Sequence, residues 1–164
     1  MRPGVRVGVD VGAARVGIAL SDGEAILATP WSTHPADADP VGAVADLVAA
    51  QEAVEVVVGL PTRLSGAEGT AAAVARAFAI ELSRRVRPVP VRVFDERLST
   101  VQAHRDLRAS GRPERRHREV VDQVAAVTIL QTALEVERAS GRPAGELIGG
   151  RKPRHAKGVK GAPR

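Results

Sequence analysis

The chain has 164 residues with 44% hydrophobic content, and it carries 24 Lys and Arg against 19 Asp and Glu for a net charge of +5. This composition excludes wholesale disorder, and the absence of cysteine excludes disulfide scaffolds, thiol catalysis and cysteine-based zinc sites. No apolar run reaches the ~20 residues of a membrane helix, and no signal-peptide pattern opens the sequence, so we expect a soluble, cytoplasmic protein without a membrane partner.

The positive charge is concentrated at one end of the sequence. Residues 151–164 contain six Lys or Arg and no acid, whereas the residues before them hold 18 basic against 19 acidic groups. All lysines lie in this final segment, which is otherwise rich in Gly and Pro. We therefore expect a near-neutral domain over residues 1–149 and a basic, disordered tail over residues 150–164 that recruits phosphate by its charge.

The first half of the sequence predicts three antiparallel strands followed by a helix. Alternating apolar and polar residues place the strands at 5–10, 16–20 and 24–29. Asp22 and Gly23 supply a tight-turn signal between the last two strands. Residues 30–40 are mostly polar and begin and end with proline, so we expect a loop there. Valines at helical spacing then predict a helix that begins near Val41.

The second half predicts alternating strands and helices. Residues 56–60 are apolar on both faces, which is typical of a parallel strand that is covered on both sides. The further expected elements are a helix at 71–82, a strand at 89–94, a short helix from a Ser99 cap to about residue 109, an Arg-rich loop at 111–118 and a helix at 119–138. This order predicts one α/β domain in which an antiparallel three-stranded meander continues into parallel strands, giving a mixed sheet flanked by helices.

Carboxylates occupy three positions where their neighbours are apolar or where a strand ends. Asp10 lies among Val and Gly residues of the first strand, and Asp95 and Glu96 follow the last predicted strand. Asp122 lies on a helical face that is otherwise apolar, made by Ala125, Ala126, Ile129 and Ala133. An acid on such a face is costly to desolvate unless a positive group meets it. The small alanines would let this helix approach the sheet and bring Asp122 toward the strand ends.

These separate acids, without a His or Cys cluster, favour Mg²⁺ or Mn²⁺, which prefer carboxylate oxygen ligands. One or two such ions could activate water and stabilise the leaving oxygen in phosphodiester hydrolysis. In the structural alternative, Asp10 caps a turn and Asp122 pairs with a nearby arginine. From the residues alone, the acid contributed by the last strand can be Asp95 or Glu96.

Arginines near these acids could hold the phosphates of a nucleic acid. Arg97 follows Glu96 directly and could contact phosphate, or it could neutralise Asp95. In the Arg-rich segment 105–118, we assign to substrate binding Arg105, Arg108, Arg112, Arg115 and Arg116. A solvated surface is the alternative interpretation of this segment. Because aromatic residues make up 2% of the chain, nucleic acid would be held through its backbone rather than by stacked bases.

The glycines after Asp10 imitate the start of a phosphate-binding loop without completing it. Ile18 and Ala19 stand where a P-loop requires Lys and Ser or Thr. We therefore expect Gly12 and Gly17 to permit the hairpin and to leave backbone accessible beside Asp10.

Four segments of the sequence resemble one known family. They are Val9-Asp10-Val11-Gly12 with Arg15-Val16-Gly17-Ile18-Ala19, Val58-Gly59-Leu60-Pro61, Asp95-Glu96-Arg97-Leu98-Ser99-Thr100, and Val121-Asp122-Gln123-Val124-Ala125-Ala126. In this order, over residues 5–138, they are similar to the YqgF/RuvX family of bacterial ribonuclease H-like proteins. Members are described as nucleases that mature the 5′ end of pre-16S ribosomal RNA and as Holliday junction resolvases. The loop at 62–68 keeps only its Gly and Glu from the family pattern, and the tail lies outside the resemblance.

The resemblance implies a ribonuclease H-like fold with a five-stranded mixed sheet and an acidic triad of Asp10, Glu96 and Asp122. These three residues would be both the catalytic residues and the ligands of one or two Mg²⁺ or Mn²⁺ ions. We expect a metal-dependent endonuclease that processes pre-16S rRNA in ribosome biogenesis. The alternatives are a resolvase of four-way DNA junctions and a non-catalytic RNA-binding assembly factor. RNA and DNA substrates, and a monomer and a homodimer, are all compatible with these residues.

Overall fold

The computed structural model describes residues 1–63, 65–98 and 115–149, and for residues 115–120 the description is limited to the backbone. Its strands are β1 (Arg6–Val11), β2 (Arg15–Ser21), β3 (Ala28–Pro35), β4 (Glu55–Leu60), β5 (Val91–Asp95) and β6 (Glu146–Leu147). Its helices are α1 (Pro40–Ala50), α2 (Thr70–Arg85), the single 3-10 turn η1 (Glu96–Leu98) and α4 (Arg115–Ser140).

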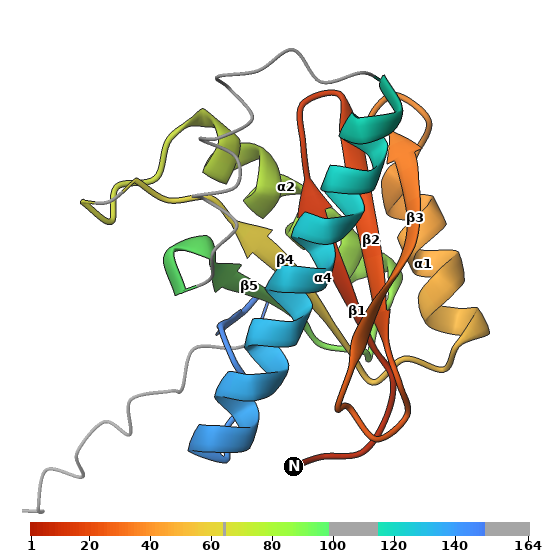
Figure 1. Ribbon diagram of the computed structural model, residues 1–164, viewed down its shortest axis with the longest axis vertical. Helices are drawn as coiled ribbons and strands as arrows, with labels where there is room; N and C mark the ends of the chain where they lie inside the picture. The colour runs from red at the N-terminus through yellow and green to blue at the C-terminus, as the bar shows by residue number, and fades with distance from the viewer. Residues whose placement is uncertain (64, 99–114, 150–164) are drawn as a thin grey trace, which may run out of the picture.

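The strands form one mixed sheet in the order β3-β2-β1-β4-β5-β6. β1, β2 and β3 pair antiparallel, as the meander predicted, and β1 pairs parallel with β4, which pairs parallel with β5. The carboxyl ends of β1, β4 and β5 therefore lie at one end of the sheet (Figure 1). The described sheet has six strands rather than the expected five, because the chain after α4 returns to pair with β5 as the two-residue β6.

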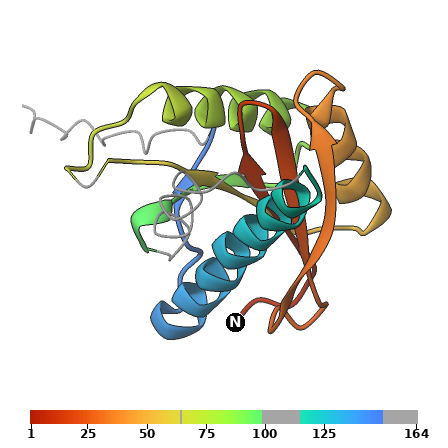
Figure 2. The same ribbon diagram turned by 45° about the horizontal axis from the view of Figure 1, so that its top comes forward.

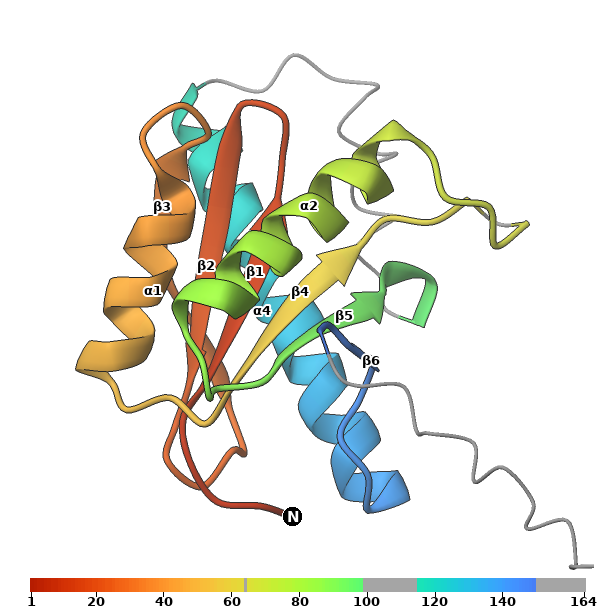
Figure 3. The same cartoon turned by 180° about the vertical axis from the view of Figure 1, so that it is seen from behind.

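Helices cover both faces of the sheet. α1 and α2 lie on one face and α4 crosses the other, so the molecule has three layers (Figures 2 and 3). Val7 and Val9 of β1 belong to the core under α1 and α2, whereas α4 supplies Ala126, Ile129 and Leu130 to the second core. Because β1 is covered on both sides, its polar residues are buried too: Arg6 is 0% exposed and Asp10 is 3% exposed.

β3 departs most from its predicted position. The expected strand at 24–29 is instead a loop followed by a strand at Ala28–Pro35. The Asp22 carboxylate lengthens the turn by accepting hydrogen bonds from the backbone N–H groups of Ile26 and Leu27, at 2.7 and 2.9 Å. The stretch after Pro30 was expected to be a loop because it is polar and rich in proline. It is a strand because β3 is the edge of the sheet, where one side faces solvent and prolines are tolerated.

The last helix begins earlier than expected. α4 starts at Arg115 rather than at residue 119, so residues 115–118 are helical and not part of the predicted loop. The predicted helix at 99–109, the loop at 111–114 and the tail at 150–164 lie outside the described residues. Within the described part of the chain, no helix is long and apolar enough to cross a membrane.

The end of the sheet opposite the strands' carboxyl ends holds a cluster of ion pairs around two buried acids, Glu55 and Glu137. Glu137 of α4 accepts hydrogen bonds from Arg2 at 2.8 and 3.1 Å and lies 3.5 Å from the guanidinium of Arg6. Glu55 of β4 accepts hydrogen bonds from Arg2 and Arg92, both at 3.1 Å. The hydrogen bonds from Arg2 lower the pKa of Glu137. These five residues, named here the ion-pair cluster, tie the amino-terminal segment to β4, β5 and the end of α4.

Candidate active site

Asp10 lies near the carboxyl end of β1, on the face covered by α4. Its Cα partner on β2 is Gly17, and the parallel pairing of Val9 with Val58 places Gly59 of β4 beside it on the other side. Gly8 is two residues earlier on β1, and a Cβ there would lie 2.6 Å from the Cβ of Leu130 on α4, which fixes the direction of this face. Asp10 is therefore a buried carboxylate flanked on both neighbouring strands by residues without side chains.

Glu96 lies next to Asp10 across Gly59. It opens η1 directly after β5 and is fully buried. Its Oε1 lies 2.8 Å from the point where a Cβ on Gly59 would be, so this carboxylate lies over the bare backbone of Gly59. Asp95 is paired with Leu60 and turns the other way, accepting a 2.6 Å hydrogen bond from the Thr62 hydroxyl. Glu96, and not Asp95, thus shares the face of Asp10.

Asp122 reaches the same region from α4. A Cβ on Gly17 would lie closer than 3.0 Å to the backbone carbonyl oxygen of Asp122, so the helix rests directly on β2 at the residue that pairs with Asp10. Ala125 and Ala126 below it are buried, as the helical face predicted. Gly17 therefore serves the approach of α4 rather than the hairpin turn for which we expected it. The hairpin requires Gly12, because a Cβ there would lie 2.6 Å from the carbonyl oxygen of Arg15.

Arg15 is the site residue that sequence reasoning missed. It is the first residue of β2, and its Nε donates a 2.9 Å hydrogen bond to Oδ2 of Asp122. The side chains of Arg15 and Asp122 are 25% and 16% exposed. The predicted structural alternative, in which Asp122 pairs with a nearby arginine, is therefore observed. The available signal was the position of Arg15 in the turn between Asp10 and Gly17.

Arg97 binds the neighbouring acid Asp95. Its Nε donates to both carboxylate oxygens of Asp95, at 3.1 and 2.9 Å, and its backbone N–H donates to Oδ1 at 2.9 Å. Together with the Thr62 hydroxyl, these bonds hold the pKa of Asp95 at about 2, so this carboxyl is ionised at neutral pH. The structure thus contains the neutralising contact that we gave as the alternative role of Arg97, and its assignment to substrate binding stays a prediction.

The other arginines assigned to the substrate fall partly outside the described residues. Arg105, Arg108 and Arg112 lie in the segment that the structure does not describe. Arg115 and Arg116 form the start of α4, where only the backbone is described. Because α4 rises about 1.5 Å per residue, these two residues lie about 10 Å along the helix axis from Asp122.

The three acids fit a divalent cation in their donor chemistry. All are carboxylates, which Mg²⁺ and Mn²⁺ prefer as ligands, and the bare glycines on both sides of Asp10 let Glu96 and α4 approach it closely. The described residues nevertheless contain no group of three His, Cys, Asp or Glu side chains gathered closely enough to hold a metal ion as they stand. Asp10 and Glu96 flank one glycine, and the Asp122 carboxylate is turned to Arg15.

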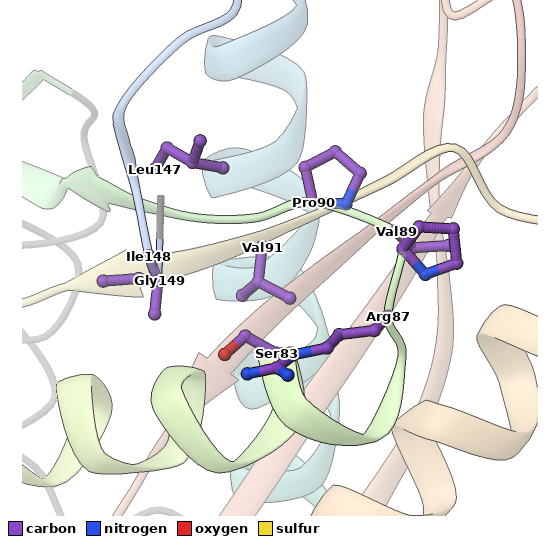
Figure 4. Close-up of a pocket in the computed structure, with 9 residues that line it drawn as sticks. Ser83, Arg87, Val89, Pro90, Val91, Leu147, Ile148 and Gly149 are labelled. Carbon is purple, nitrogen blue, oxygen red and sulfur yellow. The ribbon is translucent and has the colours of Figure 1, made fainter. Parts of the chain in front are cut away.

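A cavity of about 210 Å³ lies away from these acids, at the start of β5 (Figure 4). It is lined by Ser83 and Arg87 near the end of α2, by Val91, and by residues 147–149 after α4. Since β5 runs from Val91 to Asp95 before Glu96 follows, this cavity is at the opposite end of that strand from the acids. It is not part of the candidate active site.

The chain is similar to curated bacterial proteins along most of its length. A Streptomyces coelicolor protein named "Putative pre-16S rRNA nuclease" is 54% identical over 150 residues, which cover 90% of each chain. Proteins of the same name from Nocardioides sp. and Thermobifida fusca are 50% and 51% identical, covering 90% and 92% of this chain and 98% and 99% of their own.

Among solved structures, Thermus thermophilus RuvC in complex with a Holliday junction substrate aligns with a TM-score of 0.50. The alignment covers 83% of this chain and 96% of that chain at 15% sequence identity, so the likeness concerns the fold, which is ribonuclease H-like as expected. The pattern of the RuvX family, described as Holliday junction resolvase, matches residues 4–136, a span within which Asp10, Glu96 and Asp122 lie. The chain belongs to the RuvX family.

Proposed function

We propose that this protein is a metal-dependent endonuclease that hydrolyses phosphodiester bonds at the 5′ end of pre-16S rRNA in the cytoplasm. The observation that supports the proposal is that the buried acids Asp10 and Glu96 lie on either side of Gly59, while the backbone of Asp122 on α4 packs against Gly17, the strand partner of Asp10. Relatives about half identical over nearly the whole chain carry the name of such a nuclease, which supports this substrate.

Asp10, Glu96 and Asp122 would hold one or two Mg²⁺ or Mn²⁺ ions. Such an ion, when bound, supplies positive charge that stabilises a developing oxyanion and lowers the pKa of a coordinated water. The carboxylates alone would repel a phosphate, so binding of nucleic acid and of cation are expected to support each other. Burial of Asp10 and Glu96 keeps their orientation fixed and excludes bulk water from one side of the site.

Positive groups around the acids would orient the nucleic-acid backbone. Arg115 and Arg116, about 10 Å along α4 from Asp122, are at a distance suited to a neighbouring phosphate. Arg97 would have to exchange its contact with Asp95 for a phosphate. The basic segment 150–164 would add affinity without chemistry. Deletion after Gly150 should therefore weaken binding and its salt dependence while leaving turnover at saturating substrate unchanged.

A four-way DNA junction is the second candidate substrate, favoured by the description of the matched family. The two candidate substrates are distinguished by incubating the purified protein with a 5′-labelled pre-16S rRNA fragment and, separately, with a labelled junction. Each reaction contains Mg²⁺ or Mn²⁺. We expect the wild-type protein to cleave the rRNA fragment and the Asp10→Asn variant to be inactive on it. Asp46→Asn, at an exposed position of α1, is the matched control and should cleave as wild type does.

Cleavage confined to the junction would replace the rRNA substrate by DNA and leave the triad in place. Cleavage of either substrate by Asp10→Asn at the wild-type rate would overturn the metal-triad mechanism. Absence of cleavage together with rescue of rRNA processing in cells by Asp10→Asn would favour the non-catalytic assembly factor.

A further inference from the structure

The guanidinium of Arg15 is bonded to Asp122, the proposed metal ligand that α4 contributes. Its Nε lies 2.9 Å from Oδ2 of Asp122, and both side chains are largely shielded from solvent, at 25% and 16% exposure. A carboxylate that is shielded in this way needs a positive partner. In this structure Arg15 is such a partner.

The backbone on both sides of the pair is fixed by close packing. Arg15 and Gly17 are two residues apart on β2, so they face α4 together, and Gly17 lets the carbonyl of Asp122 rest on the strand. At the other end, the carbonyl of Arg15 accepts a 2.9 Å hydrogen bond from the N–H of Gly12, which closes the turn after Asp10. The ion pair is therefore held in place by the elements that also position Asp10.

In this arrangement Asp122 does not belong to a three-acid ligand group. Among the described residues no three His, Cys, Asp or Glu side chains lie together as a metal site, and a hydrogen bond turns the Asp122 carboxylate toward β2. We propose that Arg15 is an internal counter-ion that holds Asp122 in the metal-free protein and gives up this carboxylate when a divalent cation binds. This inference rests on the proposed function, because it requires Asp122 to be a metal ligand.

If Arg15 and a divalent cation compete for the Asp122 carboxylate, loss of Arg15 should change the metal affinity in a predictable direction. Removing the guanidinium leaves Asp122 without this competitor, so a divalent cation should bind more tightly to Arg15→Gln than to wild type. A partly exposed ion pair contributes modestly, and we expect the gain in affinity to be about three- to tenfold. A residue that merely orients Asp122 for the metal would have the opposite effect, since its loss would weaken binding.

The test is Mg²⁺ binding to the full chain, measured by calorimetry without substrate. Arg15→Gln should bind about three- to tenfold more tightly, and Arg15→Lys should remain within about twofold of wild type because it keeps a charge there. The matched control is Arg63→Gln, which removes an exposed charge near the same end of the sheet and should change the affinity by less than about twofold. Unchanged or weaker binding by Arg15→Gln would overturn the inference.

The NMR signal of the Arg15 side chain tests directly whether a metal ion displaces its guanidinium from Asp122. In the metal-free protein the Nε–H of Arg15 should give a protected NMR signal, assigned by its loss in Arg15→Lys. Saturating Mg²⁺ should shift this signal and speed its exchange with water. A signal that stays unchanged while Mg²⁺ binds would contradict displacement.

The outcomes also separate this inference from the proposed function. Wild type that fails to bind Mg²⁺, or Asp122→Asn that binds it equally well, would overturn the metal site and the role of Arg15 with it. Binding that Asp122→Asn weakens and Arg15→Gln does not tighten would overturn only the role of Arg15.

Discussion

The two ends of the central strands both hold buried charges, and they arrange them in opposite ways. At one end, three arginines meet two acids in the ion-pair cluster of Arg2, Arg6, Arg92, Glu55 and Glu137. At the other end, Asp10 and Glu96 flank the bare backbone of Gly59, and Asp122 reaches this end from α4 with its carboxylate bonded to Arg15. The first arrangement balances charge within the fold. The second gathers negative charge on one face.

We interpret the first group as charges that hold the fold and, under the proposed function, the second group as charges that act in the reaction. A buried charge with its partner in place contributes little net stability, but removal of the partner is strongly destabilising. A group of like charges destabilises the folded state and is tolerated where it binds something. Substitutions at the two ends should therefore have opposite signatures, one on stability and the other on turnover.

The largest expected effect is on turnover, from substitutions at the end of the sheet that holds Asp10, Glu96 and Asp122, named here the acidic end. Asp10→Asn should lower the rate of metal-dependent cleavage by about 10³-fold or more, because several kcal/mol of charge stabilisation depend on this ligand. Its melting temperature should stay close to that of wild type, since the amide keeps the size and shape of the carboxylate. Steady-state cleavage and thermal unfolding in EDTA measure the two quantities. A clear fall in the melting temperature would place Asp10 with the structural charges instead.

The ion-pair cluster should show the reverse pattern. Glu137→Gln leaves the fully buried Arg6 without its counter-charge, which should lower the free energy of unfolding by about 3 kcal/mol. Turnover at a temperature where the variant is folded should stay within about twofold of wild type. Chemical denaturation gives the stability. The control is Glu81→Gln in the exposed pair with Arg85, which should lose less than about 1 kcal/mol.

The contrast between the two ends was only partly visible in the sequence. Alternation along residues 5–10 predicted β1, but it could not show that Arg6 is as buried as Val7, because burial of both faces depends on helices far along the chain. Asp10 and Asp122 stood out because charges among apolar neighbours are costly. The family resemblance implied Glu96 rather than Asp95, but a physical reason for this choice required the pairing of β5 with β4. The contact of Arg15 with Asp122 joins residues 107 positions apart.

Whether a segment is a helix or a strand was predicted better than the residues at which it begins and ends. β4, α2 and β5 agree with the prediction to within a few residues, because their apolar patterns follow directly from burial. β3 was misplaced because an edge strand needs no continuous apolar pattern on its outer side. The start of α4 was misplaced because three of its first four residues are arginines, which a helix accepts as readily as a loop does.

A smaller effect tests how the acidic end is assembled. A Cβ at Gly17 would overlap the backbone carbonyl of Asp122, which cannot rotate away, so Gly17→Ala must displace α4 from β2. We expect a loss of about 2 kcal/mol in stability together with a fall in turnover. Gly23→Ala is the matched control, because no atom lies within 4 Å of a Cβ at that exposed turn position. Full activity of Gly17→Ala would mean that the approach of Asp122 to β2 is not needed for the reaction.

The smallest effect concerns Asp95, which lies at the acidic end and yet behaves as a structural charge. Hydrogen bonds from Arg97 and Thr62 lower its pKa from 3.8 to about 2 in the folded protein. A depressed carboxyl pKa stabilises the fold above the unfolded value of 3.8, and that contribution is lost as pH falls toward 2. Because the pair is partly exposed, we expect about 1 kcal/mol, seen as the difference in unfolding free energy between wild type and Asp95→Asn. That difference should be present at pH 5 and shrink toward zero near pH 2. A difference independent of pH would show that Asp95 stabilises the fold through packing rather than through its charge. Asp95 would then not count among the structural charges.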